Sequence, residues 1–179
     1  MLSELLKSPY FWSLIFVLLG FLLGEGSRYL RYRSRLCKLK RIIKEELRSM
    51  LAQIPQKKDI VQQIIAALEK HQVLPGLSVG IINTGYKQHI AELYDHFSLL
   101  ERNCLHVIHE HLDINDKILS SFEHDIKSAI QEKVMASPFR FYKIHLQEIL
   151  KSYNMVENLI KAYLHGNPTD VFHIENKRQ

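Results

Sequence analysis

The sequence lacks the signatures of the common enzyme classes. It contains no Gly-x-Ser-x-Gly nucleophile elbow and no Walker A loop. Only two cysteines are present, Cys37 and Cys104, so no disulfide framework is implied. Cys104 has Val107 and Ile108 as helical neighbours, which is typical of a small core residue and not of a nucleophile. We therefore expect no enzyme activity, no catalytic residue and no cofactor.

Charge is also absent from one long stretch near the N-terminus. Residues 8–24 (SPYFWSLIFVLLGFLLG) are seventeen uncharged residues, and Leu2, Leu5 and Leu6 extend the apolar surface. A helix that rises about 1.5 Å per residue from Leu2 to Gly24 is long enough to cross a hydrocarbon core of about 30 Å. The alternatives are a buried core helix and a cleaved signal peptide. A signal peptide fits poorly, because a dense block of cations follows the apolar stretch.

Positive charge is abundant directly after this stretch. Eight basic residues and no acidic residue lie between Arg28 and Lys44, whereas Glu4 and Lys7 cancel in the first eight residues. Because cations remain on the cytoplasmic side, we expect a single-pass membrane protein, with its N-terminus outside and residues 25–179 in the cytoplasm. Residues 45–179 contain 15 basic and 17 acidic residues. The net charge of +5 therefore reflects the bilayer as a partner and does not indicate binding to duplex DNA or RNA.

The rest of the chain shows helical periodicity. Apolar residues recur at spacings of three and four from Leu36 to Ile54, which predicts one helix from the membrane to Pro55. A second helix is expected to begin near Lys57 or Asp59, after the proline. The predicted fold class is all-α, with a transmembrane segment at 1–27, a basic stalk helix at 28–54, a helical domain at 55–168 and a loose tail at 169–179.

Local signals predict the ends of the later helices. Thr84 is expected to cap a short helix that runs to Phe97. Ser98-Leu-Leu-Glu101 fits a capping box, in which each side chain accepts a hydrogen bond from the other's backbone N–H, at the start of a long helix. Ser137-Pro138 is typical of an N-cap followed by proline in the first helical position. Gly166-Asn167-Pro168 is expected to end the last helix.

The ten histidines suggest a metal site as one hypothesis. The densest group consists of His106, His109, Glu110, His111 and Asp113. His106 and His109 share a helical face with Glu110 beside them, and metal sites do use such spacings. The zincin pattern His-Glu-x-x-His is not met, however, because Asp113 occupies the last position. We therefore interpret this segment as a polar, solvated helix face and expect no metal.

A ligand site has better ingredients. Arg102 and Asn103 lie in the first turn of the long helix, where backbone N–H groups favour an anion, and His106 follows one turn later. The loop before Thr84 offers backbone donors, Tyr86 offers a ring for stacking on a base, and lysines add charge. The alternative is a packed connection with ordinary surface lysines. The candidate ligand-binding residues are Lys57, Lys58, Ser78, Asn83, Thr84, Tyr86, Lys87, Arg102, Asn103 and His106.

Four stretches carry a resemblance to a known type of protein: GFLLGEGSRY (Gly20–Tyr29), QIPQKKDI (Gln53–Ile60), VLPGLSV (Val73–Val79) and ERNCLHVIHE (Glu101–Glu110). Together with the layout, they resemble small single-pass membrane effectors of bacterial antiphage loci, of the type associated with type III CRISPR systems. The resemblance implies a cytoplasmic domain that binds a cyclic oligoadenylate second messenger and a span that disturbs the inner membrane. Because one short span cannot form a pore, this function implies a homo-oligomer.

A second class of protein fits the same layout: a membrane-tethered helical adaptor that recruits a protein partner. An exposed apolar patch around Phe139, Phe141 and Tyr142 would favour the adaptor. The two classes differ in their response to a nucleotide, because a saturating ligand that binds only the folded form must raise the melting temperature. Cyclic oligoadenylates are therefore expected to stabilise an effector and to leave an adaptor unchanged.

Overall fold

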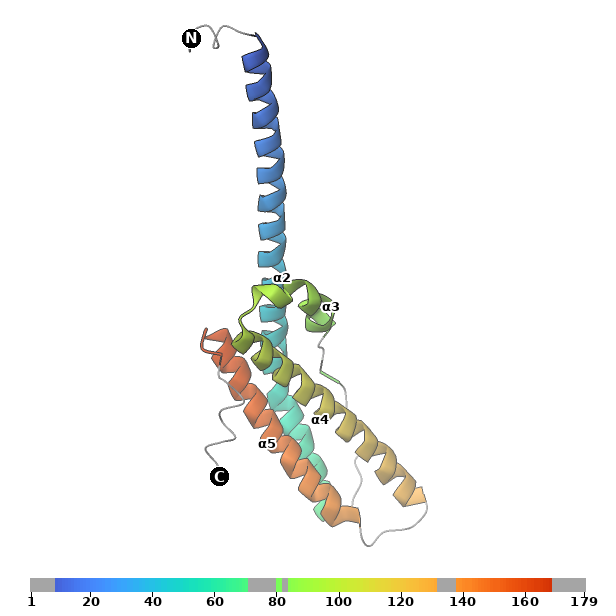
Figure 1. Cartoon of the computed structure of the whole chain (residues 1–179). Coiled ribbons are helices and arrows are strands. Elements are labelled where there is room, and N and C mark those ends of the chain that lie inside the picture. Colours follow the sequence, from blue (N-terminus) through green and yellow to red (C-terminus); the bar gives the residue numbers. More distant parts are fainter. Residues whose placement is uncertain (1–8, 71–79, 82–83, 132–137, 169–179) are drawn as a thin grey trace. The chain divides into compact units, whose positions relative to one another are not determined.

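The computed structural model describes residues 9–70, 80–81, 84–131 and 138–168 (Figure 1). Ser137 and the tail at 169–179 lie outside the described residues. No strand occurs among the described residues, and the predicted all-α class is confirmed. The chain divides into two compact units, Met1–Arg41 and Ile42–Gln179. The elements are α2 (Pro9–Glu69), α3 (Thr84–Leu93), the 3-10 helix η1 (Tyr94–His96), α4 (Leu99–Gln131) and α5 (Pro138–Leu164).

The first unit is the N-terminal part of α2, an apolar helix whose side chains are exposed. Phe16, Val17 and Leu22 point to different sides of the helix and are 67%, 69% and 63% exposed. No residue is buried in the apolar stretch near the N-terminus that could span a membrane. Within the described residues, this segment is therefore not a core helix, and it is long and apolar enough to cross a membrane.

The helix α2 continues through Pro55, so the predicted break at this residue was wrong. Proline removes the amide that would bind the carbonyl of Leu51, and its ring crowds that carbonyl, at a cost of about 3 kcal/mol. Burial on both sides of the proline offsets this cost, because Ile54 and Val61 are fully buried and Lys57 is 6% exposed. Pro55 itself lies on the exposed side of the helix. Tertiary packing therefore overrides the local signal.

The second unit is a three-helix bundle formed by the C-terminal half of α2 together with α4 and α5, which lie side by side (Figure 1). The apolar stripe predicted on α2 faces the core, with Ile43 1% exposed and Leu47, Met50 and Ile54 inaccessible. Each fully buried aliphatic side chain stabilises the fold by about 1.5–3 kcal/mol. The other two helices contribute residues at the same spacings of three and four: Leu105, Ile108, Leu112, Leu119 and Phe122 from α4, and Leu146, Ile149, Tyr153, Val156 and Ile160 from α5.

The ends of the helices follow the local signals in the sequence. The Glu101 N–H donates to Ser98 Oγ at 3.2 Å and the Ser98 N–H donates to Glu101 Oε2 at 2.8 Å, which confirms the capping box. At the C-terminal end of α5, Gly166 adopts a φ of 79° that favours glycine, and the Asn167 N–H donates to the Ala162 carbonyl. This arrangement is a Schellman motif, and it ends the helix where the Gly-Asn-Pro signal predicted.

Candidate functional site

The structure places eight of the ten candidate ligand-binding residues, and these fall into three groups. Lys57 and Lys58 belong to α2, and Thr84, Tyr86 and Lys87 belong to the first turn of α3. The third group, in the first two turns of α4, consists of Arg102, Asn103 and His106. Ser78 and Asn83 lie outside the described residues. The three lysines each bind a carboxylate from a neighbouring helix.

Lys57 forms a buried ion pair that connects α2 with α4. Its Nζ lies 2.9 Å from Asp116 Oδ1, and the two side chains are 8% and 18% exposed. The other carboxylate oxygen, Oδ2, accepts a hydrogen bond from the Ile81 N–H at 2.7 Å. Asp116 therefore holds both a lysine of the bundle and the segment before α3. Because removing one partner would leave a buried charge unpaired, this pair acts as a structural clamp.

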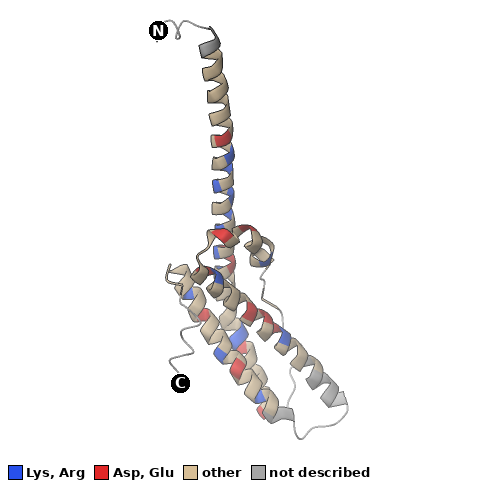
Figure 2. Cartoon of the chain, in the orientation of Figure 1, with Lys and Arg blue, Asp and Glu red and all other residues tan. Residues whose placement is uncertain are grey.

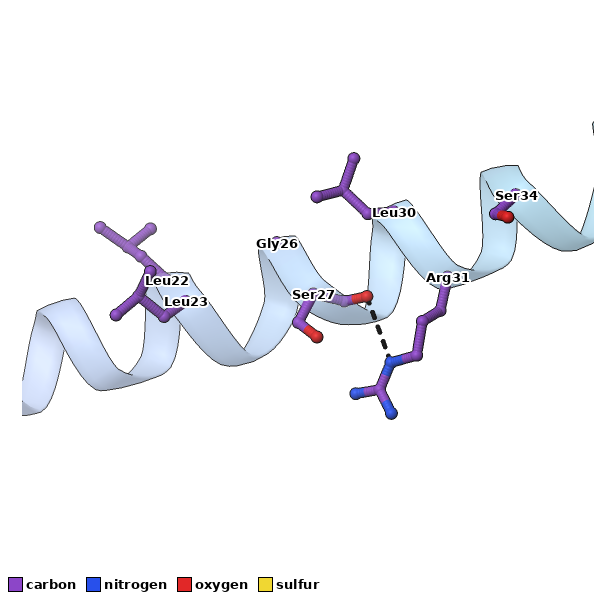
Figure 3. Close-up of a pocket in the computed structure, with 7 residues that line it drawn as sticks. All are labelled: Leu22, Leu23, Gly26, Ser27, Leu30, Arg31 and Ser34. Atoms are coloured by element: carbon purple, nitrogen blue, oxygen red, sulfur yellow. Dashed lines mark hydrogen bonds between the residues drawn. The ribbon is translucent and has the colours of Figure 1, made fainter.

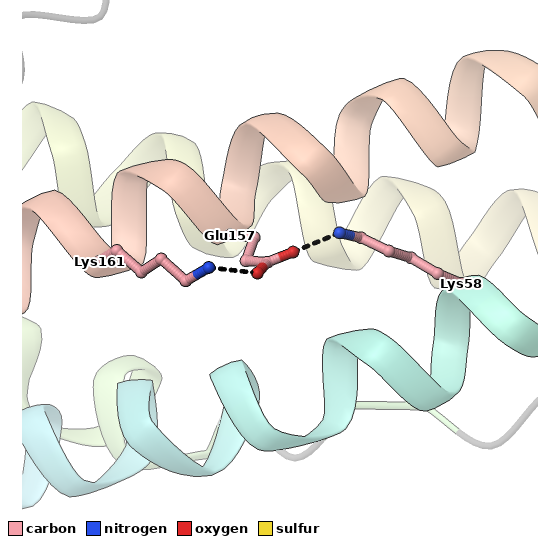
Figure 4. Close-up of polar contacts among 3 residues, drawn as sticks. All are labelled: Lys58, Glu157 and Lys161. Atoms are coloured by element: carbon pink, nitrogen blue, oxygen red, sulfur yellow. Dashed lines mark hydrogen bonds and ion pairs between the residues drawn. The ribbon is translucent and has the colours of Figure 1, made fainter.

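Lys58 takes part in a second ionic contact, between α2 and α5 (Figure 4). Its Nζ and that of Lys161 approach different oxygens of the Glu157 carboxylate, with Lys161 at 2.5 Å. Hydrogen bonds from Lys161 and Lys58 lower the pKa of Glu157. One carboxylate thus contacts two lysines, and the side chain of Lys58 is only 20% exposed.

The N-terminus of α3 is capped by a carboxylate from α2. The Tyr86 N–H donates to Glu46 Oε2 at 2.9 Å, in a first turn whose amides have no partner within the helix. Gly85 makes this approach possible, because a Cβ at this position would lie 2.1 Å from the same oxygen. Burial raises the pKa of Glu46, whereas the hydrogen bonds from Tyr86 and Gly85 act in the opposite direction. Glu46 therefore occupies the position where an external anion would bind α3.

His109 of α4 lies beneath this cap and is 3% exposed, so the expectation of a solvated helix face was wrong at this residue. Its ring stacks on the ring of Tyr86, with centroids 3.9 Å apart and planes inclined by 7°. His109 Nδ1 lies 4.0 Å from Glu46 Oε1, and neither ring nitrogen has a hydrogen-bond partner among the described residues. Burial lowers the pKa of His109 to about 3, so the imidazole is neutral at physiological pH.

The rest of the histidine group does not converge on a metal site in the part of the chain that the structure describes. No cluster of three or more His, Cys, Asp or Glu side chains there is arranged to hold an ion. His106 and Glu110 are exposed. His111 Nδ1 is 3.2 Å from Ser152 Oγ, which connects α4 with α5. Lys87 Nζ binds Asp113 Oδ2 at 2.5 Å, which connects α3 with α4.

Arg102 differs from the lysines because part of its guanidinium lacks a partner. The group lies over the ring of Tyr94, with Cζ 4.3 Å from the ring centroid. Arg102 Nε is buried and has no hydrogen-bond partner among the described residues. His106 is exposed one turn later, and Asn103 is partly exposed. The first turn of α4 therefore carries the positive charge of Arg102. The capping box already provides hydrogen-bond acceptors for the backbone N–H groups of Ser98 and Glu101.

Two residues of the α3 cap were missed by the sequence analysis. Glu46 is 40 residues before the amide that it accepts, on a helix where only the apolar stripe gave a signal. The sequence pattern predicted that His109 lies on a solvated helix face, and this prediction left its apolar neighbours out of account. The contacts of both residues favour a structural role. The neutral, buried His109 stacks on the ring of Tyr86, and Glu46 accepts a hydrogen bond from the Tyr86 N–H.

A shallow groove lies on the first unit, along one face of α2 (Figure 3). Its lining side chains all come from this single helix, with Leu22 and Leu23 at the N-terminal end and Leu30 among the polar groups that follow. Arg31 Nε donates to the Ser27 carbonyl at 3.3 Å along its edge. The lining residues are Leu22, Leu23, Gly26, Ser27, Leu30, Arg31 and Ser34.

Charge is distributed differently in the two units. Lys and Arg gather on α2 directly after its apolar part, whereas both signs alternate over the helices of the second unit (Figure 2). No family model matches the chain, and no curated protein or solved structure shows significant similarity to it.

Proposed function

We propose that the chain is a single-pass membrane protein whose helical domain is an adaptor that recruits a protein partner at the cytoplasmic face of the inner membrane. The exposed, apolar N-terminal part of α2 supports the membrane anchor. The eight basic residues from Arg28 to Lys44, set against the balanced Glu4 and Lys7, support an orientation with the domain inside.

The exposed apolar side chains near the start of α5 carry the adaptor proposal. Phe141 and Ile144 are 59% and 52% exposed, and a spacing of three residues places them on one face of the helix. Neighbouring rings pack around this face. The ring centroids of Phe141 and His145 are 4.2 Å apart, and those of Tyr142 and Phe122, which meet edge to face, are 5.1 Å apart. The side chain of Phe139 lies outside the described residues. A supported apolar patch of this kind is typical of a protein-binding surface.

The pairing of the lysines also favours a protein partner over a polyanionic nucleotide. Lys57, Lys58 and Lys87 already bind carboxylates of the same domain. A phosphate ligand would have to break these contacts, and loss of Lys57 would leave the largely buried Asp116 without its counter-charge. An apolar patch, in contrast, can bind a partner without disrupting any ion pair of the bundle.

The anchor and its orientation can be tested with the native cysteines. Cys37 is exposed and Cys104 is buried, so a membrane-impermeant maleimide should label a single residue. We expect labelling of Cys37 in inside-out vesicles and protection in right-side-out vesicles. Labelling only in right-side-out vesicles would reverse the orientation, and release of the chain by alkaline washing would contradict the anchor.

Site-specific crosslinking in cells tests the adaptor proposal. A photoreactive phenylalanine at position 141 should give one adduct of defined mass, whereas the same group at Ile114 of α4, which is 41% exposed, should not. Ile144→Asp should abolish the adduct without lowering the melting temperature, because the side chain is exposed. Equal adducts from both positions, or an adduct that survives Ile144→Asp, would contradict the proposal.

A second candidate function follows from Arg102 and from the resemblance to antiphage effectors. In this proposal, the domain binds a cyclic oligoadenylate, and the span of an assembled homo-oligomer disturbs the inner membrane. The buried Nε of Arg102, which lacks a hydrogen-bond partner among the described residues, and the exposed His106 support an anion site on α4. A symmetric ligand could join identical subunits, and it would shift the assembly by its difference in affinity between states.

The span itself has a feature that suits assembly. Gly20 and Gly24 are four residues apart, and a Cβ at either position would meet nothing within 4 Å. Small residues at this spacing allow membrane helices to approach closely. Gly20→Ile combined with Gly24→Ile should therefore reduce self-association in a membrane if the chain acts as an oligomer.

Thermal unfolding of the full chain in detergent separates the two functions. If the second candidate is correct, a cyclic oligoadenylate at 100 times its Kd should stabilise the domain by about 2.7 kcal/mol. Arg102→Gln should remove this shift, whereas Arg48→Gln, at an exposed arginine paired with Glu45, should preserve it. No shift with any cyclic oligoadenylate would leave the adaptor as the function.

A further inference from the structure

The groove on α2 combines two chemical characters along one helix face (Figure 3). Leu22, Leu23 and Leu30 are 63%, 72% and 67% exposed and form its apolar part. Ser27, Arg31 and Ser34 contribute hydroxyl and guanidinium groups. Gly26 lies between the two parts and has no side chain to fill the groove.

We propose that this groove binds one anionic phospholipid from the leaflet that faces the helical domain. The acyl chain lies along Leu22 and Leu23, and the phosphate accepts hydrogen bonds from Arg31 and from the hydroxyl of Ser27, beside which the Arg31 guanidinium lies. This inference rests on the proposed membrane anchor and adds a specific lipid contact to it.

The depth of Arg31 in a bilayer matches that of a headgroup. The uncharged stretch ends at Gly24, and Arg31 follows about 10 Å further along the helix, where its long side chain reaches the headgroups. Tyr29 and Tyr32 are 61% and 49% exposed, and aromatic rings prefer the boundary between lipid and water. Leu22 and Leu23 then lie at acyl-chain depth while Arg31 reaches the phosphates.

The geometry of Arg31 leaves it free to bind phosphate. Its one hydrogen bond within the described residues uses Nε, which donates to the Ser27 carbonyl at 3.3 Å. The two terminal amino groups can therefore form the paired contact that guanidinium makes with phosphate oxygens.

The positive charge around the groove favours an anionic lipid over a second copy of the chain as its occupant. Arg28, Arg33 and Arg35 are exposed on the same stretch of helix as Arg31. An identical helix in the groove would bring its own arginines against these, whereas an anionic headgroup neutralises them.

Native mass spectrometry of the full chain in detergent, with phosphatidylglycerol and phosphatidylcholine as probes, tests the inference. We expect retention of one phosphatidylglycerol and weaker retention of phosphatidylcholine. Arg31→Gln should weaken phosphatidylglycerol binding about fivefold and leave phosphatidylcholine unchanged. Gly26→Leu should fill the groove and abolish the preference, without a clash, because a Cβ at this position meets nothing within 4 Å.

The controls are Arg48→Gln, which removes a distant exposed arginine, and Gly24→Leu, which adds the same side chain outside the groove. Both should keep the preference for phosphatidylglycerol. Equal retention of the two lipids by the wild-type chain would overturn the inference, as would displacement of the lipid by inorganic phosphate. Loss of a dimer and not of lipid in Gly26→Leu would identify a second copy as the occupant and also overturn it.

The proposed anchor is tested separately, by alkaline extraction of membranes that contain the same variants. A chain that stays in the membrane but shows no lipid preference contradicts only the groove. A wild-type chain that is released contradicts the anchor itself.

Discussion

The two parts of α2 share one backbone but differ in how their apolar side chains are arranged. Before Arg41, large apolar residues surround the helix and are exposed, as Phe16, Val17 and Leu22 illustrate. After Ile42, the apolar residues form a single stripe, and that stripe is buried. The comparison shows that the distribution of apolar residues around a helix, and not its propensity to form, selects the surrounding medium. An all-round apolar surface suits lipid, and a one-sided stripe suits a protein core.

The largest expected effect contrasts one leucine from each part. Leu47→Ala removes a fully buried side chain and should lower the free energy of unfolding by about 3–4 kcal/mol. Leu22→Ala, at a residue that is 63% exposed, should leave the unfolding of the domain unchanged. Chemical denaturation of the full chain in detergent, followed by circular dichroism, measures both. Equal destabilisation by the two substitutions would contradict the distinction between the two environments.

A somewhat smaller effect is expected when the buried ion pair is broken. Lys57→Ala leaves Asp116 without its counter-charge and should cost about 3 kcal/mol. The matched control is Lys151→Ala, because Lys151 pairs with Glu148 in a contact that is 73% and 60% exposed. Loss of that pair should cost less than about 1 kcal/mol. If both variants unfold at the same denaturant concentration, the Lys57–Asp116 pair is not the clamp described above.

The dependence of stability on pH tests the buried histidine. Its folded-state pKa is depressed, so the unfolded chain binds the proton more tightly, and stability present above pH 6.5 is lost as the pH falls toward 3. Between pH 7 and pH 5 this contribution amounts to about 2 kcal/mol. The raised pKa of Glu46 acts in the opposite sense, so a comparison of variants is needed.

His109→Leu should therefore flatten the pH dependence of the free energy of unfolding by this amount. Ile108→Val, a core substitution on the same helix without a titrating group, should lower stability at every pH and keep the wild-type slope. Thermal and chemical unfolding at several pH values provide the measurement. A wild-type slope in His109→Leu would show that the imidazole is not desolvated.

The smallest effect concerns the capping box of α4. Ser98→Ala removes the acceptor of the Glu101 N–H and should cost about 1 kcal/mol. Ser121→Ala is the control, because Ser121 Oγ bonds only the Ile118 carbonyl within an exposed helix interior, where alanine is a good helix former. Denaturant midpoints would distinguish them, and equal stability of the two variants would exclude a capping role.

Local rules in the sequence predicted the helices well. The stripe from Ile43 to Ile54, the capping box at Ser98 and the stop at Gly166 each depend on residues within one or two turns, and all agree with the structure. Pro55 is the exception, because burial of Ile54 and Val61 on either side of it is a tertiary effect.

The partners at the candidate site could not be predicted in the same way. Lys57 binds an acid 59 residues away, and Lys58 binds one 99 residues away. Such pairs depend on the register between helices, which the period of the apolar residues leaves undetermined. For the same reason, the sequence identified Tyr86 as a ring available for stacking, although in the folded domain His109 covers one of its faces.

The continuity of α2 through Pro55 has a mechanical consequence. The carbonyl of Leu51 has no amide partner four residues later, so this turn of the second unit lacks one backbone hydrogen bond and bends more easily than a regular turn. Faster amide exchange would then be expected near residue 55 than in the turns on either side.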